Sequence, residues 1–403
     1  MLEEFKVWFS KYLIDHYRRE LMLGDVNNLL DSVLEDNDLM AEVYKKFVNF
    51  RGFVQFLIWY FNDLNCVFAV GKVIHKLKDN SPRFTRSGTI SCFDKPIILY
   101  PGHFEGMWYI EGWMFASWTD CLKEVILPNT IKSIGEYAFR NCSSLEKITI
   151  PDSVTTIKSY AFYLCSKLDN VVLPSGLKSI EEYLFDGCNE LKNIEIPNSV
   201  TSIGAHAFSR CNSLTNITIP DSVTNINYGL FWGCSSLVSV KLSKNIKNIG
   251  NATFSGCSSL TSIKIPEGVT LINTYAFSGC TSLSSVEIPN SVDCINPDAF
   301  NACTSLEKID LPNNLKFIEN NAFENCTGLR TVKIPNSVMK IDDWAFNGCN
   351  LAEIYYDGTQ SQWVGINGWI MLRKCGVKRV ICTDGVFTPD TKYYKILGTV
   401  VKI

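Results

Sequence analysis

Residues 151–173 read PDSVTTIKSYAFYLCSKLDNVVL, residues 174–196 read PSGLKSIEEYLFDGCNELKNIEI, and residues 197–219 read PNSVTSIGAHAFSRCNSLTNITI. All three segments carry proline at the first position, isoleucine at the seventh, phenylalanine at the twelfth and cysteine at the fifteenth. A segment that repeats at a fixed period is typical of a solenoid, in which each repeat forms one coil that stacks on the next. These residues therefore predict stacked coils of 23 residues.

The period extends well beyond these three segments. Phenylalanine keeps it from Phe139 to Phe346, and isoleucine keeps it from Ile134 to Ile341. Cysteine recurs at Cys142, Cys165, Cys188, Cys211, Cys234, Cys257, Cys280, Cys303, Cys326 and Cys349. We expect ten repeats over residues 122–351, each too small to bury its apolar face alone and stabilised by its neighbours.

Each position of the repeat has a structural interpretation. Ile148 and Ile150 alternate like a short parallel strand with one buried face, which Pro151 ends because proline lacks an N–H donor. The Ala161–Phe162 pair directs a large ring into the coil. Glycine often precedes the cysteine, which predicts a positive φ where the chain turns, at Gly187, Gly233, Gly256, Gly279 and Gly348.

The ladder cysteines are expected to be free and buried. Neighbouring thiols would lie about 4.8 Å apart, the spacing of adjacent strands, but with parallel rather than facing Cβ vectors, so a disulfide would distort the coil. Free cysteine fills a core as a small apolar residue, and we favour this packing role over metal or redox chemistry. Ten free thiols also favour a reducing compartment.

The units IPDSVTTIKSYAFYLCSKL and IPNSVTSIGAHAFSRCNSL closely resemble the BspA-like subfamily of leucine-rich-repeat proteins. The segment EIYYDGTQSQWVGI, residues 353–366, resembles the module that often closes such arrays in gut bacteria. The resemblance covers about residues 96–381 and implies a leucine-rich-repeat solenoid of short parallel β-strands. It also implies binding or adhesion to proteins and surfaces, with no catalytic residues.

Composition and charge argue against polyanion partners. Hydrophobic residues at 46%, charged residues at 20% and a formal net charge of -3 are ordinary for a folded protein and attract neither nucleic acid nor anionic membrane. Glu3 and Glu4 stand where a signal peptide would begin with basic residues, and polar residues interrupt the apolar stretch 52–70. We expect no membrane span and a cytoplasmic location; the alternative is the cell surface or secretion by a non-standard route.

Three further regions flank the repeats. Helical spacing, as at Phe5, Phe9 and Tyr12, predicts a small all-α domain over residues 1–80. Residues 81–121 are interpreted as a degenerate first coil and N-terminal cap, in which aromatic residues cover the open end, and residues 352–403 as a C-terminal cap.

Signatures of catalysis are missing. None of His16, His75, His103 and His206 has a second metal ligand at a recognised spacing, and no GxGxxG, P-loop, GxSxG or HExxH string occurs. We expect no enzyme activity, no metal and no cofactor.

Candidate partner-binding residues lie on a turn rather than on the strands. The outward strand positions are near neutral in sum and carry no aromatic side chain over the coils from 146 to 333, so they are poor in interface anchors. Two residues before the ladder phenylalanine, aromatic residues recur at Tyr137, Tyr160, Tyr183, His206, Tyr275 and Trp344, with Tyr163 and Trp232 on the same turn. Stacking would make a continuous aromatic stripe; the alternative is that the rings only cover the turn.

We therefore expect a non-enzymatic recognition scaffold whose solenoid holds a protein, while the N-terminal helices dock to a second component or to another copy of the chain. Two alternatives stay open. One is a surface adhesin that binds host proteins, and the other is a sensor or regulatory protein whose helical domain is the effector.

Overall fold

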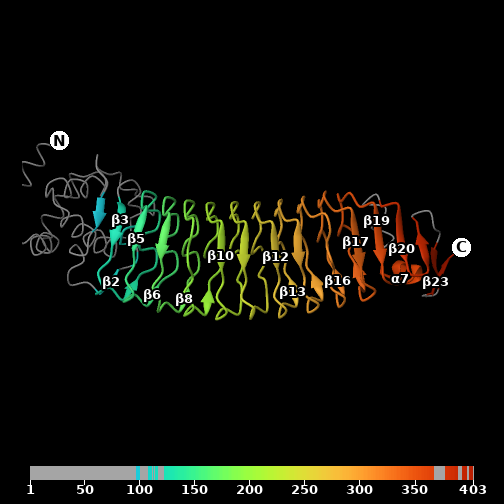
Figure 1. The fold of residues 1–403 in the computed structure, drawn as a ribbon, viewed down its shortest axis with the longest axis horizontal. Helices are drawn as coiled ribbons and strands as arrows, with labels where there is room; N and C mark the ends of the chain where they lie inside the picture. Colours follow the sequence, from blue (N-terminus) through green and yellow to red (C-terminus); the bar gives the residue numbers. More distant parts are fainter. Residues whose placement is uncertain are drawn as a thin grey trace, which may run out of the picture.

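A computed structural model of the chain (Figure 1) describes residues 108–110, 112, 114–116, 122–366 and 377–388, together with the strand backbone of 97–99, 393–396 and 399–402. The all-α domain expected over residues 1–80 lies outside the described residues, as does most of the expected N-terminal cap over 81–121.

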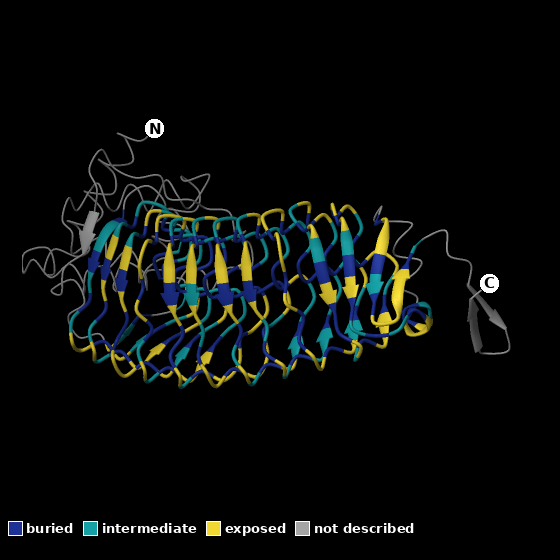
Figure 2. Cartoon of the chain, turned by 45° about the vertical axis from the view of Figure 1, so that its right-hand side comes forward, coloured by how far each residue is buried: buried dark blue, intermediate teal, exposed yellow. Residues whose placement is uncertain are grey.

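The described chain is a parallel β-solenoid whose coils stack in a nearly straight row (Figure 1). One ladder of parallel strands runs along its length, with residue partners 23 apart between regular coils, as in Ile148 with Val171, and 22 apart at its C-terminal end, as in Val332 with Ile354. Its strands are β3 (Leu122–Ile126), β5 (Lys147–Thr149), β7 (Asn170–Val172), β10 (Asn216–Thr218), β11 (Ser239–Lys241), β12 (Ser262–Lys264), β14 (Ser285–Glu287), β17 (Thr331–Ile334) and β19 (Glu353–Tyr356). Exposed and buried residues alternate along β5, β7 and β10 (Figure 2). The predicted solenoid of short parallel strands is confirmed.

A second parallel ladder lies at the isoleucine position of the repeat. The sequence predicts only one strand in each coil. The two-residue strands of this second ladder are β2 (Tyr109–Ile110), β4 (Ser133–Ile134), β6 (Thr156–Ile157), β8 (Ser179–Ile180), β9 (Ser202–Ile203), β13 (Leu271–Ile272), β15 (Cys294–Ile295), β16 (Phe317–Ile318) and β18 (Lys340–Ile341). The prediction was incomplete because coils of equal length stack in register along their whole contour. Any extended segment then meets its own equivalent one coil away.

The core is a column of phenylalanine rings, one from each of eleven coils. Neighbouring rings from Phe115 to Phe346 stack face to face with centroids 5.0 to 5.9 Å apart, and all are buried. Phe115 shows that a coil precedes the ten regular repeats.

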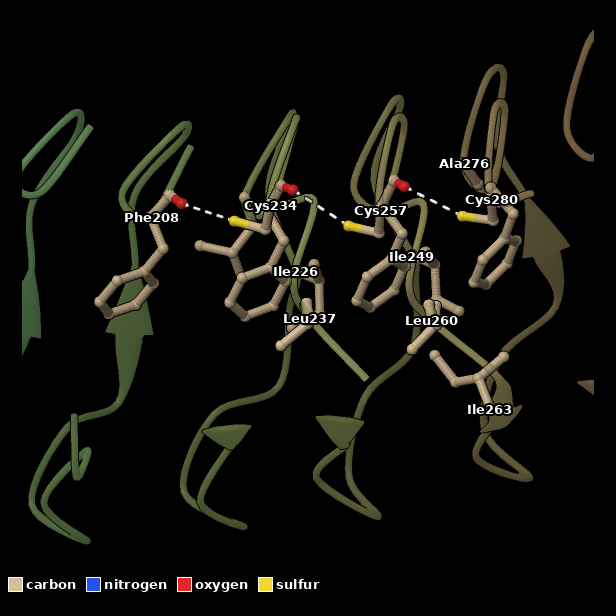
Figure 3. Close-up of a cluster of buried hydrophobic side chains, with 14 of the residues drawn as sticks. Phe208, Ile226, Cys234, Leu237, Ile249, Cys257, Leu260, Ile263, Ala276 and Cys280 are labelled. Carbon is tan, nitrogen blue, oxygen red and sulfur yellow. Dashed lines mark hydrogen bonds between the residues drawn. The ribbon is translucent and has the colours of Figure 1, made fainter. Parts of the chain in front are cut away.

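The ladder cysteines are free and buried, as expected, and each thiol donates a hydrogen bond to the phenylalanine carbonyl of the preceding coil (Figure 3). The Sγ of Cys234 lies 3.0 Å from the oxygen of Phe208, and that of Cys257 lies 3.2 Å from the oxygen of Phe231. The thiol is therefore a donor between coils as well as a core filler, and sequence reasoning identified only the second role.

The ends differ from the regular coils. At the N-terminal end, β1 (Ile97–Leu99) pairs with β3. At the C-terminal end, β19 pairs with β20 (Arg379–Cys382), which turns back into β21 (Gly385–Phe387), and a hairpin of β22 (Tyr393–Ile396) and β23 (Thr399–Lys402) follows. The short helix α7 (Gln360–Gly365) places Trp363, which is fully buried, against Tyr356.

Candidate partner-binding surface

The candidate surface is the turn that carries the ladder phenylalanine in each coil. We call it the turn edge and define it by residues 136–141, 159–164, 182–187, 205–210, 228–233, 251–256, 274–279, 297–302, 320–325 and 343–348.

Backbone geometry on the turn edge is unusual because nine of its ten coils, all but 343–348, hold left-handed residues at two positions. The expected one precedes the cysteine, for example Gly187 at φ +78. The second lies two residues before the phenylalanine, as at Tyr160 with φ 60. There the N–H of Tyr160 points along the solenoid and donates to the carbonyl of Glu182 in the next coil at 3.1 Å. The left-handed turn therefore continues the hydrogen bonding between coils.

Four rings form the aromatic stripe, which we define as Tyr137, Tyr160, Tyr183 and His206. Successive centroids lie 4.7 Å apart, with interplanar angles of 19°, 8° and 17°, so the rings stack as one continuous column. All four are partly exposed. The structure thus brings together the four candidates that occupy successive coils.

The stripe ends at Gly229. A Cβ at this position would lie 2.4 Å from Cε1 of His206, so the absent side chain leaves room for the imidazole ring. The preceding residue, Tyr228, places its ring edge-on to His206 with centroids 4.8 Å apart and is 54% exposed. Tyr228 was not predicted because it lies one position outside the stripe's register.

Two arginines adjoin the stripe and were also not predicted. The guanidinium carbon of Arg140 lies 5.7 Å from the ring centres of both Tyr137 and Tyr163, a cation–π geometry. Tyr163 in turn meets Tyr160 edge-on at 5.6 Å. Arginine and tyrosine are enriched at interface hot spots, so this cluster has the composition of a binding surface.

Arg210 is held by a buried acid. Its Nε and Nη2 donate to the two carboxylate oxygens of Asp186, each at 2.9 Å, and the Asp186 side chain is only 4% exposed. The hydrogen bonds that Arg210 donates to Asp186 raise the pKa of Arg210. This bidentate pair joins neighbouring coils, with 24 residues between partners, so the 23-residue columns of the sequence do not reveal it.

The remaining candidates are not part of the stack. Trp232 lies beyond the end of the stripe and is 43% exposed. Tyr275 and Trp344 are exposed at separate coils, where the equivalent positions on the neighbouring coils are Ala252, Asp298 and Asn321. The turn edge therefore has an aromatic half, over coils 136–233, and a half with isolated rings, over coils 251–348.

The second half is acidic and amide-rich. Asn301 donates to Asp298 at 2.8 Å and to Glu324 at 3.1 Å, and Asn347 donates to the other oxygen of Glu324 at 2.9 Å. Its charged side chains are Asp298, Glu324 and Asp343, with no basic residue.

The pKa values of two stripe residues are shifted in the direction that favours their uncharged forms. Burial raises the pKa of Tyr160 to about 12, with added effects from Tyr137 and Tyr183. Burial also lowers the pKa of His206 below its ordinary value of 6.5. These shifts favour the uncharged forms of Tyr160 and His206 at neutral pH.

Stability alone does not account for the stripe. Left-handed backbone costs about 1–2 kcal/mol for a residue with a side chain. A stacked aromatic pair contributes about 0.5–1.5 kcal/mol, so stacking roughly offsets the backbone cost. Asn321, at φ 56, shows that a residue suited to this backbone occupies the same position in another coil.

The strand face has fewer side chains suited to binding a partner than the turn edge has. A groove of about 470 Å³ lies at its C-terminal end, lined in part by Tyr355. Its charged groups pair with one another, Lys308 with Asp310 and Lys333 with Asp357, both at 2.9 Å. Exposed pairs of this kind contribute little and leave few free groups for a ligand.

The ladder thiols are in an environment that makes them unreactive. Burial raises the pKa of Cys165 and of Cys234 to about 12, which removes the thiolate that reactivity requires. Within the described residues, no group of three or more His, Cys, Asp or Glu side chains is placed to hold a metal ion. No helix in the described part of the chain has the length and apolarity to cross a membrane.

Comparisons with known proteins agree with the repeat. The family model described as BspA type leucine rich repeat region matches residues 109–238 and 229–353, in six copies. A solved leucine rich cell surface protein from Faecalibacterium prausnitzii A2-165 is 30% identical, over 64% of this chain and 85% of that chain, with a TM-score of 0.44. The leucine rich repeat protein TpLRR of T. pallidum is 32% identical, over 41% of this chain and 77% of that one, with a TM-score of 0.37. A leucine-rich repeat protein from Bacteroides ovatus ATCC 8483 is 32% identical, over 60% and 80%, with a TM-score of 0.33. No curated protein matches the chain.

Proposed function

Because the chain belongs to the BspA type leucine-rich repeat family, we propose that it is a non-enzymatic recognition scaffold that binds a protein partner at the aromatic half of its turn edge. The supporting observation is the aromatic stripe with Arg140 and Tyr163 beside it. These are the side chains from which interface hot spots are built.

Backbone geometry supports a binding role over a covering role. The four stripe residues have φ between 54 and 60, a conformation that glycine or asparagine adopts at lower cost. A turn that needed only to be covered could use those residues, as it does at Gly229 and Asn321. Rings held against the backbone preference point to a function outside the fold.

The buried thiols do not decide the compartment. Each ladder cysteine is buried and its thiol donates a hydrogen bond to a backbone carbonyl, as Cys234 does to Phe208, so burial protects it from oxidants in any compartment. The proposed function therefore applies equally to a cytoplasmic scaffold and to a surface protein, and cell fractionation distinguishes the two.

The test replaces three stripe rings at once. The variant Tyr137→Asn, Tyr160→Asn, Tyr183→Asn keeps residues that accept left-handed backbone. A matched control, Thr149→Ser, Val172→Ser, Glu195→Ser, alters exposed residues at or next to the strand ladder in the same coils. Tagged chains are expressed in the native host, crosslinked and captured, and co-captured proteins are quantified by mass spectrometry.

The proposal expects the stripe variant to lose at least one protein that the wild-type chain and the control both retain, with far-UV circular dichroism unchanged. Equal capture by all three folded chains would contradict it.

A further inference from the structure

The groove of about 470 Å³ at the C-terminal end of the strand face lies over β17, β19 and β20, which are side by side in Figure 1. Its volume falls within the range of about 300–1,000 Å³ that is typical of small-molecule sites. Its lining comes from the strand ladder and the chain just beyond it, and includes no residue of the turn edge. The proposed protein-binding surface therefore does not account for it.

Tyr355 forms an aromatic platform in the groove. On β19 it lies between Lys333 of β17 and Ile381 of β20, its partners in register. Its phenol donates to Oε2 of Glu353 at 2.9 Å, and residues two apart on a strand share one face. A ring held at its hydroxyl end by a neighbour on the same face lies along the sheet, with one ring face toward solvent. Tyr355 is accordingly 41% exposed.

A second hydrogen bond fixes this platform. Nε of Arg379, on the neighbouring strand β20, donates to Oε1 of Glu353 at 2.7 Å. The two oxygens of Glu353 are thus engaged by different groups, one by Arg379 and the other by Tyr355. A ring that is already fixed loses little conformational entropy when a ligand stacks on it.

The charged side chains that line the groove cancel one another. They are two lysines and two aspartates, of which Lys308 pairs with Asp310 and Lys333 pairs with Asp357. A charged ligand would compete with these pairs and would meet no net charge of opposite sign. The groove therefore favours an uncharged ligand.

Polar groups nevertheless surround the platform. Thr331 and Thr383 bring hydroxyl groups to the lining, and both are at least partly exposed. The paired carboxylates keep lone pairs and the paired ammonium groups keep N–H donors, so both can still bond to a ligand hydroxyl. An uncharged molecule with hydroxyl groups at its rim and C–H groups on its faces matches this lining and the aromatic platform. Sugar rings have this chemistry.

We propose that the groove binds an uncharged oligosaccharide, one ring of which stacks on Tyr355 while its hydroxyl groups bond to the threonine and aspartate side chains of the lining. The site is separate from the turn edge and adds a second class of ligand to the protein partner proposed there.

An extended peptide is a poorer occupant. It would bind by adding to a free strand edge, but β19 pairs with β17 on one side and β20 on the other, and β20 pairs also with β21. The strands under the platform thus offer no unpaired backbone edge for β-addition. A sugar needs only the side chains that the groove provides.

The first test screens the full chain against an array of neutral and acidic oligosaccharides. Cellobiose, maltose, lactose and chitobiose then serve as neutral probes in saturation-transfer NMR and calorimetry. The proposal expects binding to neutral members of the array, with an affinity that stays constant between about 50 and about 500 mM sodium chloride, because salt screens only charged contacts.

The second test removes single groups from the groove. Tyr355→Ala should weaken binding of the best neutral sugar by about tenfold or more, because the ring provides the stacking face. Thr331→Val, which keeps the shape and removes one hydroxyl, should weaken it severalfold and serves also if Tyr355→Ala does not fold. The matched control Tyr228→Ala removes a tyrosine that is 54% exposed on the turn edge and should leave sugar binding unchanged.

Three results would overturn the inference: no binding to any neutral oligosaccharide, binding to acidic ones only, or binding that survives both groove substitutions in folded chains. The variant Tyr137→Asn, Tyr160→Asn, Tyr183→Asn should keep its sugar affinity while it loses captured protein. Failure of one site therefore leaves the other standing.

Discussion

Phe162 and Tyr160 make a decisive comparison because they lie two residues apart on one coil and stack between the same two neighbouring coils. Phe162 lies 5.4 Å from Phe139 and 5.5 Å from Phe185, while Tyr160 lies 4.7 Å from the rings on both sides. If stacking alone determined their contributions to the free energy of unfolding, Tyr160 would contribute at least as much as Phe162.

Burial and backbone separate the two. Phe162 is fully buried, so Phe162→Ala removes a whole ring from the core and should lower the free energy of unfolding by about 3–5 kcal/mol. Tyr160→Asn loses two stacking contacts of about 0.5–1.5 kcal/mol each, but relieves about 1–2 kcal/mol of left-handed backbone cost. Its net effect should therefore lie between a gain of about 1 kcal/mol and a loss of about 2 kcal/mol in the free energy of unfolding.

Urea unfolding followed by far-UV circular dichroism measures both variants, with Phe162→Leu as a control that retains most of the core volume. Amide hydrogen exchange then locates the damage, which for Phe162→Ala should spread to the coils on both sides because solenoid stability is shared between neighbours. A loss for Tyr160→Asn as large as that for Phe162→Ala would show that the stripe is core, and would remove the physical basis for a binding edge.

Three further outcomes follow from buried groups. Iodoacetamide should modify at most six of the sixteen cysteines in the native chain and all sixteen in urea. The ten ladder thiols are buried, and the pKa of Cys165, for example, is raised to about 12. Intact mass gives the number of labels, and more than six labels on the folded chain would contradict the prediction. Arg210→Ala should destabilise the chain by about 2 kcal/mol by leaving the Asp186 carboxylate buried without its partner, whereas the double variant Asp186→Ser, Arg210→Gly, which reproduces the pair found in other coils, should recover most of the loss in urea unfolding. Burial lowers the pKa of His206 below 6.5, so just below that pH the unfolded chain binds more protons than the folded chain. The contribution of His206 to the free energy of unfolding therefore rises with pH in this range. His206→Asn should remove that rise, and a difference in stability between the two chains that does not change with pH would refute the prediction.

Much of the candidate surface was visible in the sequence, but its limits were not. Tyr137, Tyr160, Tyr183 and His206 share one column of the repeat and therefore one stack. Tyr275 and Trp344 occupy the same column yet stand apart, because a stack needs rings on consecutive coils. A column identifies residues that share a position, and only adjacency along the solenoid makes them a surface.

Contacts that cross between columns could not be predicted. Arg210 reaches Asp186, and Arg140 lies over both Tyr137 and Tyr163, because long side chains span from one column to the next once the coils are stacked. Their partners lie 24, 3 and 23 residues away, so no single spacing marks them.

The sequence by itself determined the period, the number of regular coils and which positions of each coil are buried, because the same apolar pattern recurs every 23 residues. Only the tertiary structure decided the rest. Each coil must satisfy the hydrogen-bond donors and acceptors of the next coil. This requirement accounts for the left-handed backbone at Tyr160 and for the hydrogen bond from the Cys234 thiol to the Phe208 carbonyl. A periodic sequence specifies one coil many times over, and the hydrogen bonds between coils then set how their turns are shaped.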